Sequence, residues 1–265
     1  MITDDTVICA TDKRGVATLT LNRPALHNAF DDALIESLLL ALAAIEDDPA
    51  VRAVVLRSEG KSFSAGADLN WMRRMAGYDR EQNRNDALQL AALMARLNGL
   101  NKPTIARVQG AAFGGGVGLV ACCDIAVAAE RALFALTEVR LGLLPAVISP
   151  YVIAAIGERA ARRYMLTGER FDAAEALRIG LLHEAVPEDQ LDSALERLLE
   201  SLLKGGPQAL TKAKELIFAV SRRPAGEALI ADTAERITDV RASDEGREGV
   251  GAFLEKRPPA WVGQG

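Results

Sequence analysis

The sequence has few cysteines, few histidines and no long apolar run. Of 265 residues, three are cysteine and two are histidine. Three cysteines, two of them adjacent at Cys122 and Cys123, give no disulfide framework, so we expect a reducing, cytoplasmic compartment. The distant histidines, His27 and His183, argue against a histidine-based metal site, and we expect no metal. Every apolar run is far shorter than the roughly 20 residues of a membrane span, so we expect no membrane segment.

Clusters of basic residues are also missing. The formal net charge is −5 and the lysines and arginines are scattered, which argues against a nucleic-acid surface. The N-terminal segment 1–5 is acidic and lacks the apolar segment of a signal peptide. Hydrophobic residues make up 49% and charged residues 25%, a balance that allows a large core in one domain, or in a domain with a small appendage.

Strand and helix patterns alternate over the first two thirds of the chain, and helical patterns fill the rest. We expect strands at 7–10, 15–21, 53–57, 103–109, 125–129 and 181–186, and helices at 31–45, 80–98, 152–156, 159–166, 190–204, 208–220, 226–240 and 245–254. This order predicts an α/β core at 1–195 followed by a helical C-terminal region at 196–265.

Glycine is concentrated where an expected strand passes into an expected helix. The segment Gly110–Gly118 contains five glycines after the buried strand 103–109. Its spacing does not fit a dinucleotide-binding G-x-G-x-x-G motif, because Leu119 stands at the third glycine position. Bare N–H groups at the first turn of a helix can bind a negatively charged oxygen.

A second loop of this kind is Ala65–Asp68, which also lies between a strand and a helix. In a parallel sheet both loops would lie at the carboxyl ends of strands, where ligands bind. One N–H from each loop could converge on one oxygen and form an oxyanion hole. The alternative is that the glycines only allow tight helix–strand packing.

Glu138 stands in the mostly apolar segment Phe134–Gly142. Apolar neighbours desolvate a carboxylate and raise its pKa, which suits proton transfer near neutral pH. The alternative is a surface glutamate, or one that is ion-paired with Arg140.

Three of these segments resemble motifs of the enoyl-CoA hydratase/isomerase, or crotonase, superfamily. Phe63–Leu69 and Gly110–Gly116 look like its two oxyanion-hole segments, and Phe134–Leu143 looks like its catalytic-glutamate segment. Within the superfamily, Ala146–Tyr151 followed by Arg159–Tyr164 is similar to bacterial methylglutaconyl-CoA hydratases of leucine breakdown and to relatives acting on isoprenoid glutaconyl-CoA esters.

The resemblance implies a crotonase-like ββα spiral core, C-terminal helices that form a homotrimer or a dimer of trimers, and an acyl-CoA substrate. It implies that the N–H groups of Ala67 and Gly115 bind the thioester oxygen and that Glu138 transfers protons. Coenzyme A would be part of the substrate, and no separate cofactor is expected. Three further residues would lie along the CoA moiety: Ala65, Asp68 and Leu69.

Two positions depart from the family pattern. Typical hydratases have a first glutamate where this chain has Gly118, and the lysine that often follows the Arg-Pro pair is replaced by Ala25. Hydration remains the expected reaction, with Glu138 acting on both water and the α-carbon. A single glutamate also fits an enoyl-CoA isomerase, and a non-catalytic acyl-CoA- or RNA-binding protein is the third alternative.

Overall fold

The computed structural model describes residues 6–221 and 223–263, and its first two thirds form an α/β core. The six-stranded main sheet has the order β1-β2-β3-β5-β7-β10, in which only β1 is antiparallel to its neighbour. Its strands are β1 Val7–Thr11, β2 Val16–Leu21, β3 Ala53–Ser58, β5 Thr104–Val108, β7 Ile125–Ala129 and β10 Glu184–Val186. All six strands were predicted. The acidic N-terminal segment 1–5 lies outside the described residues.

A second, smaller sheet was not predicted from the sequence. It has the order β4-β6-β8-β9, and its parallel strands β4, β6 and β8 are followed by the antiparallel β9. The strands are β4 Ser62–Ser64, β6 Ala111–Phe113, β8 Leu133–Ala135 and β9 Arg170–Asp172, each three residues long. This sheet provides the strand ends from which the predicted site loops begin.

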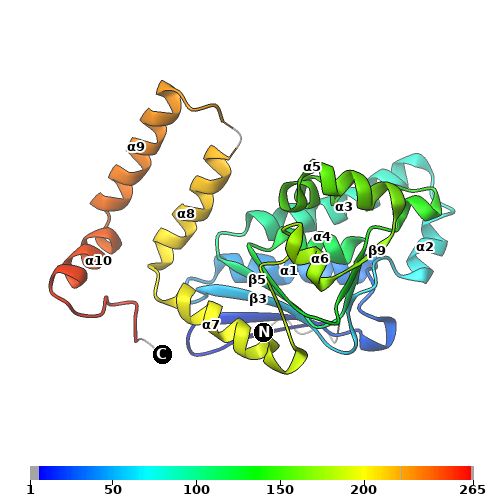
Figure 1. Ribbon diagram of the computed structural model, residues 1–265, viewed down its shortest axis with the longest axis horizontal. Helices are drawn as coiled ribbons and strands as arrows, with labels where there is room; N and C mark the ends of the chain where they lie inside the picture. Colours follow the sequence, from blue (N-terminus) through cyan, green and yellow to red (C-terminus); the bar gives the residue numbers. More distant parts are fainter. Residues whose placement is uncertain (1–5, 222, 264–265) are drawn as a thin grey trace.

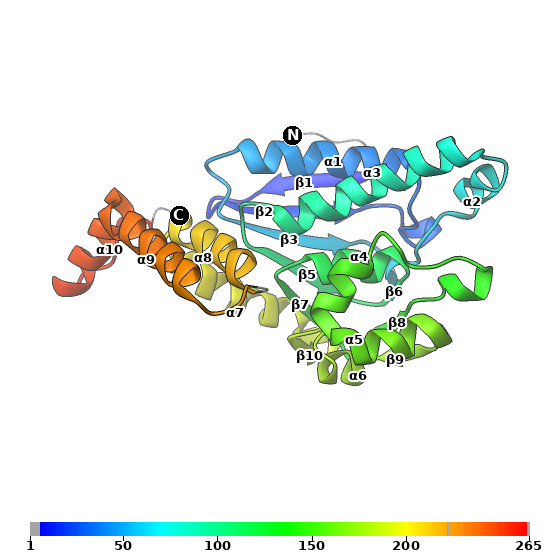
Figure 2. The same cartoon turned by 90° about the horizontal axis from the view of Figure 1, so that it is seen from above.

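Helices cover both faces of the main sheet. The helices α1 (Asp32–Asp47) and α3 (Arg80–Gly99) lie along one face (Figure 2). The N-cap of α1 is Asp31, whose side chain accepts a hydrogen bond from Leu34 N at 2.8 Å. The other helices of the core are α2 Leu69–Met75, α4 Gly115–Cys122, α5 Ser149–Thr167 and α6 Ala173–Arg178. The helical segments predicted at 152–156 and 159–166 are both present within α5, on either side of a kink at Gly157, whose backbone is not helical.

The opposite face of the main sheet is covered by α7 (Leu191–Leu203). Leu199 is buried against Val16, Val55 and Ile105, and four further leucines of α7 pack around this cluster. The leucines of α7 therefore belong to the core of the chain itself. The expected boundary between 195 and 196 falls inside this helix.

The last three helices project away from the core (Figure 1). They are α8 Pro207–Val220, α9 Glu227–Ala242 and α10 Asp244–Leu254. Lys214 fixes α8 to the core, because its buried Nζ lies 2.9 Å from Oδ2 of Asp124. Among the described residues, no helix combines the length and the apolar character that crossing a membrane requires.

Candidate active site

The two predicted loops begin side by side because β4 and β6 are parallel neighbours. Ser62 pairs with Ala111, and Ser64 pairs with Ala112. The backbones remain in contact beyond the strands: a Cβ atom on Gly116 would lie only 2.7 Å from the carbonyl oxygen of Ser64. The expectation that both loops follow parallel strands is therefore met, in the small sheet rather than in the main one.

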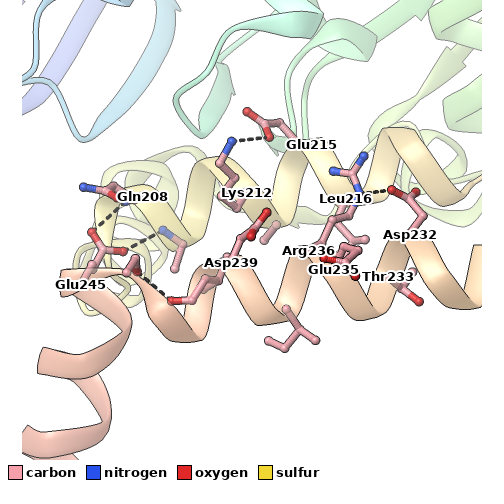
Figure 3. A pocket seen from close by; sticks show the side chains of 15 residues that line it. Gln208, Lys212, Glu215, Leu216, Asp232, Thr233, Glu235, Arg236, Asp239 and Glu245 are labelled. Carbon is pink, nitrogen blue, oxygen red and sulfur yellow. Dashed lines mark hydrogen bonds and ion pairs between the residues drawn. The ribbon is translucent and has the colours of Figure 1, made fainter.

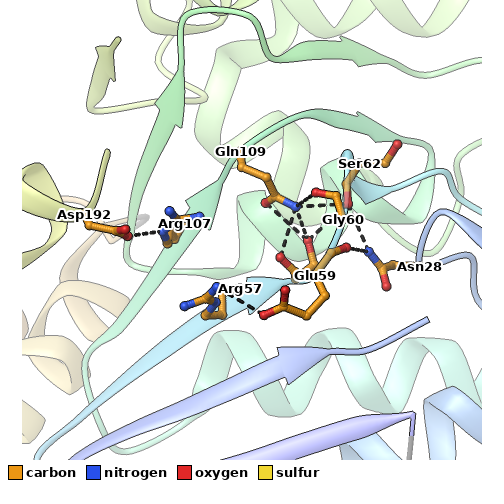
Figure 4. Close-up of polar contacts among 9 residues, drawn as sticks. Asn28, Arg57, Glu59, Gly60, Ser62, Arg107, Gln109 and Asp192 are labelled. Atoms are coloured by element: carbon orange, nitrogen blue, oxygen red, sulfur yellow. Dashed lines mark hydrogen bonds and ion pairs between the residues drawn. The ribbon is translucent and has the colours of Figure 1, made fainter. Parts of the chain in front are cut away.

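A buried polar network fixes the first loop (Figure 4). Gln109 Nε2 donates hydrogen bonds to the carbonyl oxygens of Ser58, Gly60 and Ser62 at 3.0, 3.0 and 3.2 Å. Asn28 Nδ2 donates to the same carbonyl oxygen of Ser62 at 3.0 Å. These two amides satisfy the carbonyl groups of the turn from β3 to β4, so the start of the 65–68 loop is held by both sheets.

The N–H of Ala67 is left free by the way its loop pairs with Phe30. Phe30 N donates to Gly66 O and accepts through its carbonyl from Asp68 N, both at 2.7 Å. In such a parallel bridge the intervening residue points its own N–H away from the partner strand. Ala67 is exposed, and its N–H has no acceptor within the part of the chain that the structure describes.

The N–H of Gly115 is free because it opens α4. Gly114 N donates to Ala135 O at 2.9 Å, and Gly118 N donates to Gly114 O at 3.2 Å. Gly115 lies at the first helical position, where an N–H has no intrahelical partner, and none is found among residues 6–221 and 223–263. The φ angle of Gly114 is 49°, a backbone conformation that side chains disfavour.

Glu138 lies directly beside this helix start. It begins the short 3-10 helix Glu138–Leu141 that follows β8. A Cβ atom on Gly114 would lie 2.9 Å from Glu138 Oε1, and the buried Oε2 has no hydrogen-bond partner in the described structure. Desolvation by burial raises the pKa of Glu138. The alternative of an ion pair with Arg140 is wrong, because the Arg140 side chain lies against Gly168 and forms no bridge to Glu138.

The position of Gly118 is enclosed by apolar side chains. A Cβ atom there would lie 2.3 Å from Ile148 Cγ2 and 3.3 Å from Met94 Cε. No side chain fits at this position unless Ile148 moves, so a second carboxylate has no space there. The sequence analysis did not identify Ile148 as a site residue. The only pointer in the sequence was the resemblance of the Ala146–Tyr151 segment, which does not single out Ile148.

The three residues predicted to contact CoA lie on the same loop. The carboxylate of Asp68 caps α2, since Oδ1 accepts from Asn70 N at 2.8 Å and from Trp71 N at 3.1 Å. Ala65 is exposed and its N–H donates to the carbonyl of His27, whereas the Leu69 side chain is largely exposed. Of the three, Ala65 and the Leu69 side chain are therefore open to a ligand, whereas Asp68 is buried and bonded.

Other features of the molecule lie away from Glu138. No group of three or more potential metal-ligating side chains occurs among the described residues. A hollow of 560 Å³ lies between α8 and α9, and another of 740 Å³ is lined by residues of α5 and α6. Cys122 and Cys123 are buried, and burial raises the pKa of both thiols.

Comparison with known proteins agrees with this arrangement. A family model described as enoyl-CoA hydratase/isomerase matches residues 11–264. An enoyl-CoA hydratase structure from Shewanella pealeana is 48% identical, with a TM-score of 0.94 over 97% of this chain and 96% of that one. The structure of Pseudomonas aeruginosa AtuE is 38% identical, with a TM-score of 0.92 over 97% and 99% of the two chains. The 2,3-dehydroadipyl-CoA hydratase of Escherichia coli is 37% identical over 94% of this chain and 96% of its own length.

Proposed function

The chain belongs to the enoyl-CoA hydratase/isomerase family, and we propose that it adds water across the 2,3 double bond of a 2-enoyl-CoA thioester. Relatives at 32–38% identity over most of the chain carry hydratase names. One observation carries the proposal: a buried carboxylate oxygen of Glu138 lies beside a helix start with an N–H, and neither group has a partner among the described residues. A fold rarely leaves buried polar groups unsatisfied without a functional reason.

The proposed reaction uses Glu138 twice. Glu138 accepts a proton from water, the hydroxide oxygen bonds to the β-carbon, and the double-bond electrons move through the α-carbon to the thioester oxygen as an enolate. The N–H groups of Ala67 and Gly115 stabilise that oxygen, more strongly in the transition state than in the ground state. The enolate then collapses, the protonated Glu138 returns the proton to the α-carbon, and the net result is the addition of one water molecule.

The CoA part of the substrate would lie along the first loop. Ala65 and Leu69 would contact it through exposed groups. Asp68 would shape this part of the loop, because its carboxylate caps α2 and its N–H and carbonyl are bonded to Phe30 and Met72. In this proposal CoA enters and leaves as part of the substrate, and no separate cofactor takes part.

The acyl group we favour carries a second carboxylate, as in 3-methylglutaconyl-CoA of leucine breakdown. Two observations support this choice: the resemblance of the 146–151 segment, and a relative named for a dicarboxylic substrate, dehydroadipyl-CoA. Two arginines of α2, Arg73 and Arg74, already have side-chain partners. Arg73 donates to Asn70 at 2.8 Å and Arg74 to Asp32 at 2.5 Å.

A second candidate reaction is isomerisation. The enclosed position of Gly118 leaves no space for a second carboxylate there, and one glutamate can move a proton from the γ-carbon to the α-carbon. Isomerisation moves the double bond without adding oxygen, so product analysis separates the two reactions.

The test is a panel of enoyl-CoA esters incubated in D2O. Hydration adds one D2O and places deuterium at the α-carbon, whereas isomerisation leaves the oxygen count unchanged. We expect hydration, with kcat/KM higher for 3-methylglutaconyl-CoA than for crotonyl-CoA. Acyl-CoA binding without any turnover would support the non-catalytic alternative instead, and RNA retained on a filter in moderate salt would indicate a nucleic-acid-binding protein.

We also propose that the C-terminal helices form a homotrimer, or a dimer of trimers. Large apolar side chains are exposed on them: Phe253 is 81% exposed and Leu254 is 73% exposed. The groove between α8 and α9 is lined by Leu216 and Val240 among charged residues (Figure 3), so apolar surface is accessible there as well. Such surface favours association. Light scattering should give three or six times the 28.3 kDa chain mass, and a monomer would contradict this proposal.

A further inference from the structure

One face of α4 passes from the Glu138 carboxylate into an apolar core. Gly114, Gly118 and Cys122 are spaced four residues apart, so they share this face. Gly114 faces Glu138 Oε1, and Gly118 faces Ile148. Cys122 Sγ lies 3.7 Å from the sulfur of Met94, which completes the apolar end of the face. Glu138 and Ile148 therefore lie against successive positions of this face, Glu138 at the N-cap and Ile148 one turn further along α4.

From this arrangement we propose that Ile148, backed by Met94, is a specificity-determining residue of the acyl site. Its side chain fills the space next to Glu138, so that the site holds one carboxylic acid and presents an apolar wall to the β-carbon. The β-carbon carries the rest of the acyl chain and one further substituent, and the wall faces that further substituent. It accepts hydrogen or methyl there and excludes larger or charged groups from that side. This inference rests on the proposed function, because it places the β-carbon beside Glu138.

Ile148 is held firmly in this position. It is 3% exposed and Met94 is fully buried. Ile148 lies at the N-cap of α5, and its carbonyl accepts hydrogen bonds from Tyr151 N at 3.1 Å and Val152 N at 3.0 Å. Because backbone and side chain are both constrained, the wall cannot withdraw without moving the start of α5.

The wall also accounts for the environment of Glu138. An aliphatic neighbour offers no hydrogen-bond donor, in agreement with the unpartnered Oε2. It also excludes water from one side of the carboxylate and so contributes to the desolvation that raises the pKa of Glu138. Removing the wall should change two properties together: the size of the β-substituent that is accepted, and the pH at which Glu138 ionises.

The first experiment compares Ile148→Ala with wild type on 2-enoyl-CoA esters of one chain length, whose second β-substituent, beside the acyl chain, is hydrogen, methyl or ethyl. One methylene in an apolar pocket changes kcat/KM by roughly 10- to 200-fold. We expect the ethyl-to-methyl ratio to rise about tenfold or more and the acid limb of the pH profile to move to lower pH. Ile148→Val should fall between Ile148→Ala and wild type. The control Val152→Ala, which removes a buried group elsewhere on α5, should leave ratio and profile within about twofold of wild type.

A binding measurement separates this inference from the proposed function. Calorimetry with the corresponding saturated acyl-CoA esters gives Kd ratios that need no turnover. If the wild type has no activity and Ile148→Ala changes the ethyl-to-methyl Kd ratio, the proposed function is overturned and the wall is supported. An active wild type, with both ratios and the pH profile unchanged in a folded Ile148→Ala variant, would overturn the wall and leave the proposed function intact.

A packing test completes the set. Gly118→Ala places a Cβ atom 2.3 Å from Ile148 Cγ2, so we expect a lower Tm. The Tm loss caused by Gly118→Ala should be at least halved when it is measured in the Ile148→Ala background, which lacks that atom. In the Val152→Ala background the Tm loss caused by Gly118→Ala should be unchanged. If Gly118→Ala lowers Tm equally in the two backgrounds, the contact on which the wall depends is contradicted.

Discussion

Gly114→Ala tests whether Glu138 must stay where the fold holds it. The added Cβ atom would lie 2.9 Å from Glu138 Oε1 and 3.6 Å from its carboxyl carbon. Ordinary van der Waals contact begins at 3.4 Å, so the carboxylate has to move by several tenths of an ångström. The variant therefore displaces the proposed acid–base group while its chemistry stays intact.

The expected loss follows from that displacement. A misplacement of about 1 Å can cost 10²-fold in rate, so we expect kcat to fall between about 10- and 100-fold. The backbone adds a separate cost, because alanine is strained at a φ of 49°. That strain amounts to about 1–3 kcal/mol of folding stability.

Gly157→Ala is the matched control for the strain. Gly157 has a φ of 73° and a ψ of 160°, and a Cβ atom there would meet nothing within 4 Å. Both variants should lose a similar number of degrees in Tm, and only Gly114→Ala should lose kcat in a hydration assay with saturating enoyl-CoA. If the folded Gly114→Ala protein keeps kcat within twofold of Gly157→Ala, the position of Glu138 does not matter and the mechanism is wrong.

Further predictions concern three residues: Glu138, Asp68 and Lys214. Glu138→Gln should reduce kcat by about 10²–10⁴-fold. In wild type, kcat/KM should fall as pH decreases through the raised pKa of Glu138. A flat pH profile would contradict the role of Glu138 as the base. Because burial raises the folded-state pKa of Glu138 above its ordinary value, ionising Glu138 destabilises the fold, so Glu138→Gln should raise Tm at pH 7 and not near pH 4. Asp68→Ala should cost about 1 kcal/mol through the lost cap of α2, and Asp68→Asn much less. Lys214→Met should cost about 1–3 kcal/mol by leaving Asp124 without its cation, and proteolysis between α7 and α8 should accelerate; unchanged proteolysis would mean that this ion pair does not hold α8.

The main sheet and most helices follow from local patterns that the sequence displays. The apolar positions of α1 recur at helical spacing behind a capping aspartate, and β7 is a continuous apolar run. The second sheet could not be predicted in this way. Its strands are only three residues long, too short for an alternating pattern. In addition, β6 runs directly into the glycines at the start of α4, so no turn residues mark where the strand ends. Pairing between segments far apart in the sequence defines these strands, and a single sequence does not display it.

The same distinction applies to the candidate site: some of its residues show a local signal in the sequence, and one does not. Glycine-rich loops and an acid in an apolar segment are local signals, so the segments of Ala67, Gly115 and Glu138 were identified from the sequence. Ile148 is different, because an isoleucine in a loop carries no chemical signal of its own. Its significance comes only from its contact with Gly118, thirty positions earlier.

The position of unsatisfied polar groups provides a reason to treat this region as a site rather than as tight packing. Folding strongly favours pairing of buried polar groups, and the Gln109 network satisfies three carbonyl groups of a single turn. Next to that network, two loop amides and one buried carboxylate oxygen have no partner among the described residues. Glycines that served only to pack α4 against the small sheet would not require Glu138 to stay unpaired beside Gly114. A thioester that brings an oxygen for the amides, together with a water molecule that brings a proton for the carboxylate, accounts for both.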